Sequence, residues 1–284
     1  MSAEISPTYR GRIAPSPTGR LHLGHALTFW TAQERARPGT LILRIEDLDS
    51  TRCRPEFRAA IAEDLHWFGI HWREGPDLGG PFAPYTQSQR DYLPAWRKLR
   101  DASLIYPCTC SRRDVLSSLS APHPDDQPEP DEPIYPGTCR HRLAEARSIE
   151  NPTGVNWRFR VPDGEEIHFH DGRAGDMRAI AGRDFGDFLV WRKDNIPSYQ
   201  LAVVTDDDAM QITEVVRGED LIQSTFRQLL LYRALNFPEP AWYHCPLIRD
   251  PEGHRLAKRH ASLTLRELRT SGAAPAQLRS KLPG

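Results

Sequence analysis

Two histidines, His22 and His25, follow a glycine-containing turn and stand three residues apart in the segment GRLHLGHA. Residues at this spacing share one face of a helix, so both imidazoles can reach the same ligand. The first turn of a helix also offers unpaired backbone N–H groups and the positive end of the helix dipole, which together bind phosphate. We therefore expect His22, Gly24 and His25 to bind the phosphates of a nucleotide such as ATP. A pair of surface histidines after a turn is the alternative.

Three of the five cysteines are grouped in one part of the chain, as Cys108-Thr-Cys110 and, further on, Cys139. Because the number of cysteines is odd and the N-terminus lacks a secretory signal, metal binding is favoured over disulfides. Three thiolates and a fourth ligand would make a tetrahedral zinc site of the structural type. Three free cysteines in a loop are the alternative, and Cys53 and Cys245 are expected to be unpaired.

The histidine pair is expected to begin a helix that lies between two strands. Residues 23–37 carry apolar side chains at helical spacing, and Pro38-Gly39 ends that pattern. The apolar run TLILRIE that follows is typical of a buried parallel strand. With the strand before the turn this makes a βαβ unit, and ligands of such folds bind at the carboxyl ends of the strands. Further helices are predicted over about 55–68 and 89–103.

The length of 284 residues predicts one α/β core that carries inserted subdomains. No apolar run approaches the roughly 20 residues that span a bilayer, so we expect a cytoplasmic protein without membrane contact. The formal net charge is -1, which excludes a global electrostatic attraction to nucleic acid. Any contact with RNA must therefore come from a local patch of Arg and Lys.

Changes in composition divide the chain into four segments. Residues 1–105 contain the βαβ unit, and residues 106–184 contain the grouped cysteines, an acidic proline-rich stretch and short strand-like runs. An α/β pattern resumes in residues 185–250, and residues 251–284 carry a basic loop and a C-terminal helix. The core is thus predicted to be interrupted by a zinc-binding subdomain and then resumed.

The segment from Arg12 to Ala26, RIAPSPTGRLHLGHA, resembles the glutamate-specific class I aminoacyl-tRNA synthetases. HLGH matches their HIGH signature, and the flanking residues match the pattern RxAPSPTGxLHxGHA. The resemblance covers nearly the whole chain and implies a Rossmann-type, parallel-sheet core that binds a nucleotide. It also implies a second ATP-binding motif, the KMSKS loop, at RLAKR, with Lys258 as its catalytic lysine. This chain departs from the family pattern there, because Ala257 and Arg259 replace two serines.

Glutamate carries two carboxylates and an ammonium group, so its pocket is expected to contain arginines and an acid. By the resemblance, Glu46 binds the ammonium group, and Tyr199 and Arg217 complete the pocket. The same resemblance assigns the substrate-binding residues of the first motif, which are Arg12, Ile13, Ala14, Pro15 and Ser16. Each stretch alone is better explained as an ordinary strand end or a plain amphipathic segment. Their order along the chain favours a glutamate pocket.

The stretches YPCTCSR and YPGTCR match the zinc-binding insertion of the glutamyl-queuosine tRNA(Asp) synthetases, in which a tyrosine is the fourth zinc ligand. The resemblance implies one structural zinc ion, held by Cys108, Cys110, Tyr135 and Cys139. Because the ordinary pKa of tyrosine is about 10, the histidines His123 and His141 are rival candidates for the fourth position.

The chain ends about 25 residues after Lys258, so no anticodon-binding domain is expected. With the insertion, this implies an enzyme that activates L-glutamate with ATP and Mg²⁺ and transfers it to the queuosine base of tRNA(Asp). We expect it to act as a monomer. One alternative is a truncated or discriminating glutamyl-tRNA synthetase that charges a tRNA 3′ end. Another is a non-catalytic relative that binds tRNA or glutamate.

Overall fold

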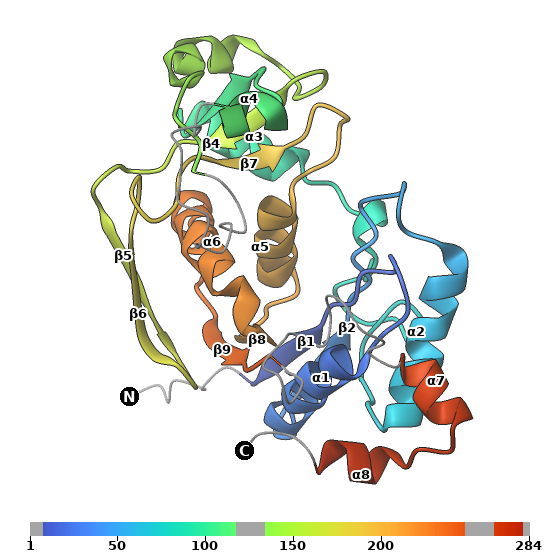
Figure 1. The fold of residues 1–284 in the computed structure, drawn as a ribbon. Coiled ribbons are helices and arrows are strands. Elements are labelled where there is room, and N and C mark those ends of the chain that lie inside the picture. Colours follow the sequence, from blue (N-terminus) through green and yellow to red (C-terminus); the bar gives the residue numbers. More distant parts are fainter. Residues whose placement is uncertain (1–7, 118–133, 248–263, 281–284) are drawn as a thin grey trace, which may run out of the picture.

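The computed structural model describes residues 8–117, 134–247 and 264–280, and its centre is a six-stranded sheet (Figure 1). The strands run in the order β2-β1-β8-β9-β5-β6, and only β6 pairs antiparallel to its neighbour. Their bounds are β1 Arg10–Ile13, β2 Thr40–Leu43, β5 Glu166–Asp171, β6 Gly175–Ile180, β8 Glu214–Gly218 and β9 Ala241–Cys245. The largely parallel sheet, joined by helices, confirms the predicted α/β class.

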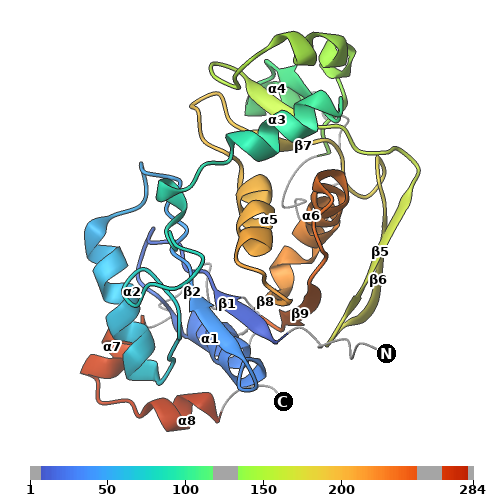
Figure 2. The ribbon, with the colours of Figure 1, turned by 180° about the vertical axis from the view of Figure 1, so that it is seen from behind.

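Helices cover both faces of this sheet. Helix α1 (Leu23–Arg35) joins β1 to β2 and packs against β1 and β8. Helices α5 (Tyr199–Ala209) and α6 (Ile222–Leu235) pack on each other and lie on the opposite side, as Figures 1 and 2 show. The predicted βαβ unit is therefore present. Its return to β2 needs the glycine at position 39, since a Cβ there would lie 2.0 Å from the backbone oxygen of Tyr9.

A smaller, antiparallel sheet lies apart from β1 and β2, at the top of Figure 1. It consists of β3 (Ile105–Cys108), β4 (Asn156–Phe159) and β7 (Phe188–Trp191). The rings of Trp96 and Trp157 meet edge to face, with centroids 4.8 Å apart, and anchor α3 on this sheet. Around it lie α3 Leu93–Asp101, α4 Arg112–Ser117 and the 3₁₀ helix Arg140–Ser148.

The strand pairing differs from the predicted segments in two places. Strands β5 and β6 fall within residues 106–184, yet they extend the six-stranded sheet, whereas β7 falls within residues 185–250 and joins the smaller sheet. The reason is the pleat of β5, whose alternate residues Ile167 and Phe169 point into the main core. The four-segment division itself stays a prediction.

Two predicted helices show how proline and glycine set helix ends. Helix α2 spans Pro55–Phe68 and ends at Gly69, whose φ of +91° suits glycine, so the expected range of about 55–68 is confirmed. Helix α3 begins later than the predicted residue 89, because Pro94 must lie in the first turn. A 3₁₀ turn, Gln87–Gln89, precedes it. The described chain ends with α7 Leu265–Thr270, which contacts α2, and α8 Pro275–Arg279.

Candidate functional site

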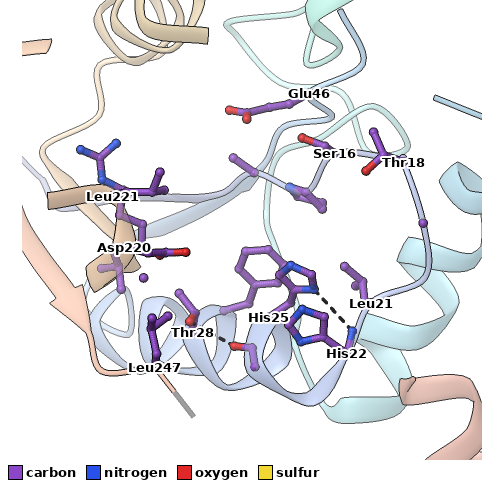
Figure 3. A pocket seen from close by; sticks show the side chains of 18 of the residues that line it. Ser16, Thr18, Leu21, His22, His25, Thr28, Glu46, Asp220, Leu221 and Leu247 are labelled. Atoms are coloured by element: carbon purple, nitrogen blue, oxygen red, sulfur yellow. Dashed lines mark hydrogen bonds between the residues drawn. The ribbon is translucent and has the colours of Figure 1, made fainter. Parts of the chain in front are cut away.

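A cavity of about 590 Å³ opens where β1 and β8 end and α1 begins (Figure 3). Its position is the one expected for a ligand site in a parallel sheet, at the carboxyl ends of the strands. Ten of the predicted site residues line it, namely Arg12, Ala14, Pro15, Ser16, His22, Gly24, His25, Glu46, Tyr199 and Arg217. Ile13 does not line the cavity, because its side chain is fully buried in the core below. Lys258 lies outside the described residues.

The two histidines of the first motif stack on each other at the N-terminus of α1. Their ring centroids are 3.6 Å apart, and Nδ1 of His25 accepts the backbone N–H of His22 at 3.4 Å. Gly24 permits this stack, since a Cβ at that position would lie 3.0 Å from Cε1 of His22. Burial lowers the pKa of both imidazoles, that of His25 to about 4. Both rings are therefore neutral near pH 7 and act as hydrogen-bond partners rather than as cations.

Arg217 lies on the β8 wall of the cavity and is 5% exposed. Its Nε donates to His244 Nε2 at 3.1 Å and its Nη2 to the hydroxyl of Thr225 at 2.6 Å. The buried Nη1 makes no hydrogen bond of ordinary geometry, and the Tyr199 hydroxyl lies close to the same guanidinium. Within the part of the chain that the structure describes, Arg217 makes no ion pair. Burial consequently lowers its pKa, as expected of a desolvated cation without a counterion. An anion in the cavity would supply that counterion.

Arg12 and Glu46, which have opposite charges, are linked behind the cavity wall through Arg44 and Asp207. Arg12 Nε donates to Asp207 Oδ1 at 3.3 Å, and Arg44 Nη1 donates to the same oxygen at 2.6 Å. Arg44 Nη2 then donates to Glu46 at 3.0 Å. Arg44 is fully buried and Asp207 is 1% exposed. The chain of contacts Arg12–Asp207–Arg44–Glu46, here called the charge relay, holds both cavity residues in place through direct contacts.

A second carboxylate, Asp206, fastens α5 to the segment before α3. It accepts hydrogen bonds from Gln87 Nε2 at 2.7 Å and from the hydroxyl of Tyr92, and it pairs with Arg90 at 2.7 Å. This contact fixes the helix whose first residue is Tyr199. That helix begins there because the Ser198 side chain accepts the backbone N–H of Leu201.

Arg44, Asp206 and Asp207 were not among the predicted site residues, although the sequence carries a signal for them. An arginine inside the apolar run TLILRIE and two acids closing the apolar segment YQLAVVT stand at positions that should be buried. Buried charges are rarely left unpaired, so such residues point to a tertiary charge network. The sequence alone does not say which charge meets which.

The grouped cysteines meet in a small cluster beside the three-stranded sheet. The Sγ atoms of Cys108, Cys110 and Cys139 all lie within 4.8 Å of one another, and the last two are 3.6 Å apart. The hydroxyl of Tyr135 lies 3.4 Å from Sγ of both Cys108 and Cys110. A tetrahedral zinc with bonds of about 2.3 Å to sulfur separates its sulfurs by about 3.8 Å and a sulfur from an oxygen by about 3.5 Å. The four side chains therefore fit a tetrahedral metal site.

The surroundings favour the anionic form of Cys139, whereas burial raises the pKa of Cys110 and of Tyr135. Hydrogen bonds from the Tyr135 hydroxyl and the Thr109 backbone outweigh the effect of burial and lower the pKa of Cys139 to about 6. The guanidinium of Arg158 stacks on the Tyr135 ring at 3.9 Å and donates to Cys108 Sγ at 3.4 Å. His141 is turned away, with its Nδ1 3.0 Å from the backbone oxygen of Thr138.

His141, one of the two rival histidines, does not belong to the cluster. The metal-capable group that the structure brings together in its described residues contains the three cysteines and no histidine. His123 lies outside those residues. The other two cysteines, Cys53 and Cys245, are free thiols. No helix of the described chain has the length and apolar character needed to cross a membrane.

The fold and the cavity together define a class of protein. Residues 8–282 match the family model for the catalytic domain of class I tRNA synthetases of the E and Q type, and the chain belongs to this family. It resembles a solved glutamate tRNA ligase from Elizabethkingia meningosepticum, crystallised with its amino acid, at a TM-score of 0.70 and 27% identity. That match covers 93% of this chain and 53% of the ligase, so the chain spans about half of that protein.

Two relatives match over most of their own length. A protein of Nitratidesulfovibrio vulgaris named glutamyl-Q tRNA(Asp) synthetase is 46% identical over 275 residues, which is 95% of this chain and 83% of the relative. A protein of the same name from Symbiobacterium thermophilum is 48% identical over 271 residues, or 93% of this chain and 82% of the relative.

Proposed function

We propose that this protein is a ligase that activates L-glutamate with ATP and then transfers the glutamyl group to queuosine in tRNA(Asp). The observation that carries the proposal is the pair of relatives named glutamyl-Q tRNA(Asp) synthetase, at 46% and 48% identity over more than four fifths of their length. The cavity supports it independently, because Arg12 and Arg217 in its lining can pair with the two carboxylates of glutamate and Glu46 with its ammonium group.

In this proposal the cavity orients glutamate by charge. Arg12 and Arg217 pair with the substrate carboxylates, and Glu46 pairs with the ammonium group. Ser16 and Tyr199 complete the pocket with their hydroxyls. The charge relay keeps Arg12 and Glu46 at a constant separation, so the substrate meets preformed partners and little free energy is lost in ordering them.

ATP is proposed to bind across the start of α1. Glu46 lies across the cavity from the His22–His25 pair in Figure 3, so glutamate bound near Glu46 would face phosphates held at that helix end. Neutral His22 and His25, with the backbone at Gly24, donate hydrogen bonds to the phosphates, whose remaining charge Mg²⁺ offsets. Lys258, in the RLAKR segment, is proposed to stabilise the transferring phosphate.

The first step requires no general base, since the α-carboxylate of glutamate is already ionised at neutral pH. One of its oxygens attacks the α-phosphorus of ATP in line, the bond to the bridging oxygen breaks, and pyrophosphate leaves. Catalysis is then a matter of positioning and charge stabilisation. In the second step a queuosine hydroxyl attacks the carbonyl carbon of the adenylate, loses its proton, and AMP leaves.

The cysteine cluster is assigned a structural role. Three thiolates and the Tyr135 hydroxyl would hold a zinc ion with no position left for a substrate, which is the arrangement of structural zinc. The cluster links the end of β3, at Cys108, to the start of the 3₁₀ helix Arg140–Ser148, which packs against β3. The fourth ligand, the monomeric state and the cytoplasmic location stay predictions.

The test begins with glutamate-dependent exchange of pyrophosphate into ATP in the absence of tRNA. Exchange with glutamate but not with glutamine is the expected result, and comparable exchange with both would reject the substrate. Radiolabelled glutamate is then offered to tRNA(Asp) with and without queuosine, and the label is located after digestion. Label in the anticodon loop of queuosine-containing tRNA alone supports the proposal.

Label on the 3′-terminal adenosine would favour the second candidate, a glutamate tRNA ligase that charges the tRNA end. The similarity to the glutamate tRNA ligase of Elizabethkingia meningosepticum is the observation that favours this second candidate. Binding of glutamate or tRNA without any exchange would favour the non-catalytic relative.

A further inference from the structure

Behind Arg217, on the side away from the cavity, lies a buried row of polar groups. His244 on β9 is the register neighbour of Arg217 on β8, and it is fully buried. Its Nε2 is 3.1 Å from Arg217 Nε, and its Nδ1 is 2.6 Å from Asp171 Oδ2. Asp171, at the end of β5, is also fully buried. None of these groups has a role in the steps described above.

The hydrogen bonds determine the protonation of this row. A guanidinium N–H can only donate, so Nε2 of His244 must accept, and the ring hydrogen is on Nδ1, facing Asp171. Asp171 in turn accepts four N–H groups, from the backbones of Arg173 and Ala174 on one oxygen and from the backbone and ring of His244 on the other. Only an ionised carboxylate can accept all four. The imidazole is neutral, and burial together with Arg217 lowers its pKa to about 4.

We propose that His244, oriented by Asp171, is a positioning residue that fixes the guanidinium of Arg217 at the cavity wall while leaving its charge without a carboxylate partner. This inference rests on the proposed glutamate activation. Two neutral acceptors, His244 and Thr225, hold Nε and Nη2, so the guanidinium cannot rotate. A carboxylate in place of His244 would hold it equally well but would neutralise it.

Arg12 and Arg217, which both line the cavity, differ in this respect. Arg12 already shares Asp207 with Arg44, so part of its charge is offset inside the protein. Arg217 offers a full charge, which a carboxylate satisfies and an amide does not. His244 thereby sets the preference for glutamate over glutamine through Arg217, without touching the substrate.

The test compares His244→Phe, which keeps a ring but removes the acceptor, with His244→Gln, whose amide oxygen restores one near the position of Nε2. In the pyrophosphate exchange assay, His244→Phe is expected to raise KM for glutamate about 10- to 100-fold, the usual effect of losing a buried hydrogen bond to a charged group. KM for ATP should change less than about twofold. His244→Gln should recover most of the glutamate affinity.

Phe185→Leu serves as the matched control, since Phe185 is a fully buried ring of the main core and is not among the hydrogen-bond partners of Arg217 in the described chain. It should lower the melting temperature without raising KM for glutamate. If His244 has only a structural role, His244→Phe and Phe185→Leu should both lower the melting temperature, and neither should change KM for glutamate. That result would overturn the proposal.

A double variant shows whether His244 acts through Arg217. If it does, adding His244→Phe to Arg217→Ala should raise KM for glutamate no further, because the guanidinium is already gone. Additive losses would overturn the proposal. Should His244→Phe fail to fold, Asp171→Asn replaces it, since an amide cannot accept four N–H groups and is expected to raise the same KM.

The exchange activity of the unmodified protein separates a failure of the proposed glutamate activation from a failure of the proposed role of His244. If it shows no glutamate-dependent exchange, the proposed function fails and this inference with it. If it shows exchange, and His244→Phe has an unchanged KM for glutamate, only the positioning role is rejected.

Discussion

Arg44 is a fully buried cation that pairs with three carboxylates. It donates to Asp207 at 2.6 Å and to Glu46 at 3.0 Å, and its Nε lies 3.8 Å from Asp206. Replacement by methionine keeps most of the volume and removes the charge, which leaves three buried acids with too few partners. Breaking a buried ion pair from one side costs about 3–5 kcal/mol. At about 2 °C per kcal/mol for a chain of this size, Arg44→Met should melt about 6–10 °C below the parent.

The same change should disable Glu46. Burial already raises the pKa of Glu46, and Arg44 is the largest opposing influence. Without Arg44 the pKa rises further, and a protonated Glu46 cannot pair with an ammonium group, so KM for glutamate should increase. The folded variant then binds more protons than its unfolded chain, and its stability falls as pH rises. Acidification from pH 8 to pH 6 should therefore narrow the difference in melting temperature between Arg44→Met and the parent.

Thermal unfolding across this pH range, with the exchange assay at each pH, provides the measurement. Arg37→Met is a suitable control, because Arg37 pairs with Glu34 at the surface and its side chain is 70% exposed. Loss of an exposed pair costs less than about 1 kcal/mol. The reasoning is refuted if Arg44→Met melts at the same temperature as the Arg37→Met control and has an unchanged KM for glutamate. The charge relay would then not be what holds Arg12 and Glu46 in place.

Three further predictions concern other parts of the molecule. His25→Asn should lower kcat of pyrophosphate exchange on the order of 10²–10³-fold with KM for glutamate nearly unchanged, and similar single-turnover rates in variant and parent would remove His25 from catalysis. Elemental analysis should find one zinc per chain, lost in Cys110→Ser together with a lower melting temperature; a fully active, metal-free parent would make the cysteines incidental. Because His244 has its pKa lowered from 6.5 to about 4, the unfolded chain binds its proton more tightly, and about 3 kcal/mol of stability should disappear as pH falls through that window. Urea unfolding at pH 7 and pH 4 should show a smaller loss in His244→Phe, and an equal loss would contradict the assignment.

Local chemistry explains which features could be predicted from the sequence. The start of α1 follows from two histidines flanking a glycine at the mouth of a helix, and the ends of α2 follow from Pro55 and Gly69. Such signals act over a few residues, and no distant part of the chain has to be known. The cavity residues of the first motif are likewise contiguous, which is why their clustering was predictable.

The charge relay and the row behind Arg217 depend on contacts that no local pattern encodes. Arg44 and Asp207 are 163 residues apart, and Asp171 and His244 are 73 apart. In the sequence each of these residues looks like any other charged or polar residue, because only the order of the strands in the sheet brings the partners together. The position of β5 is the decisive case, because its pairing with β9 brings Asp171 beside His244, behind Arg217.

The arrangement of buried charge connects stability with specificity. Arg44 pairs with three buried carboxylates, one of which it shares with Arg12, whereas Arg217 is held by neutral groups and makes no ion pair within the described residues. The cost of burying Arg217 lowers the stability of the unliganded protein, and binding of an anion of the right shape removes this cost. An amide ligand would leave the charge unpaired, so the same feature that weakens the empty fold discriminates glutamate from glutamine.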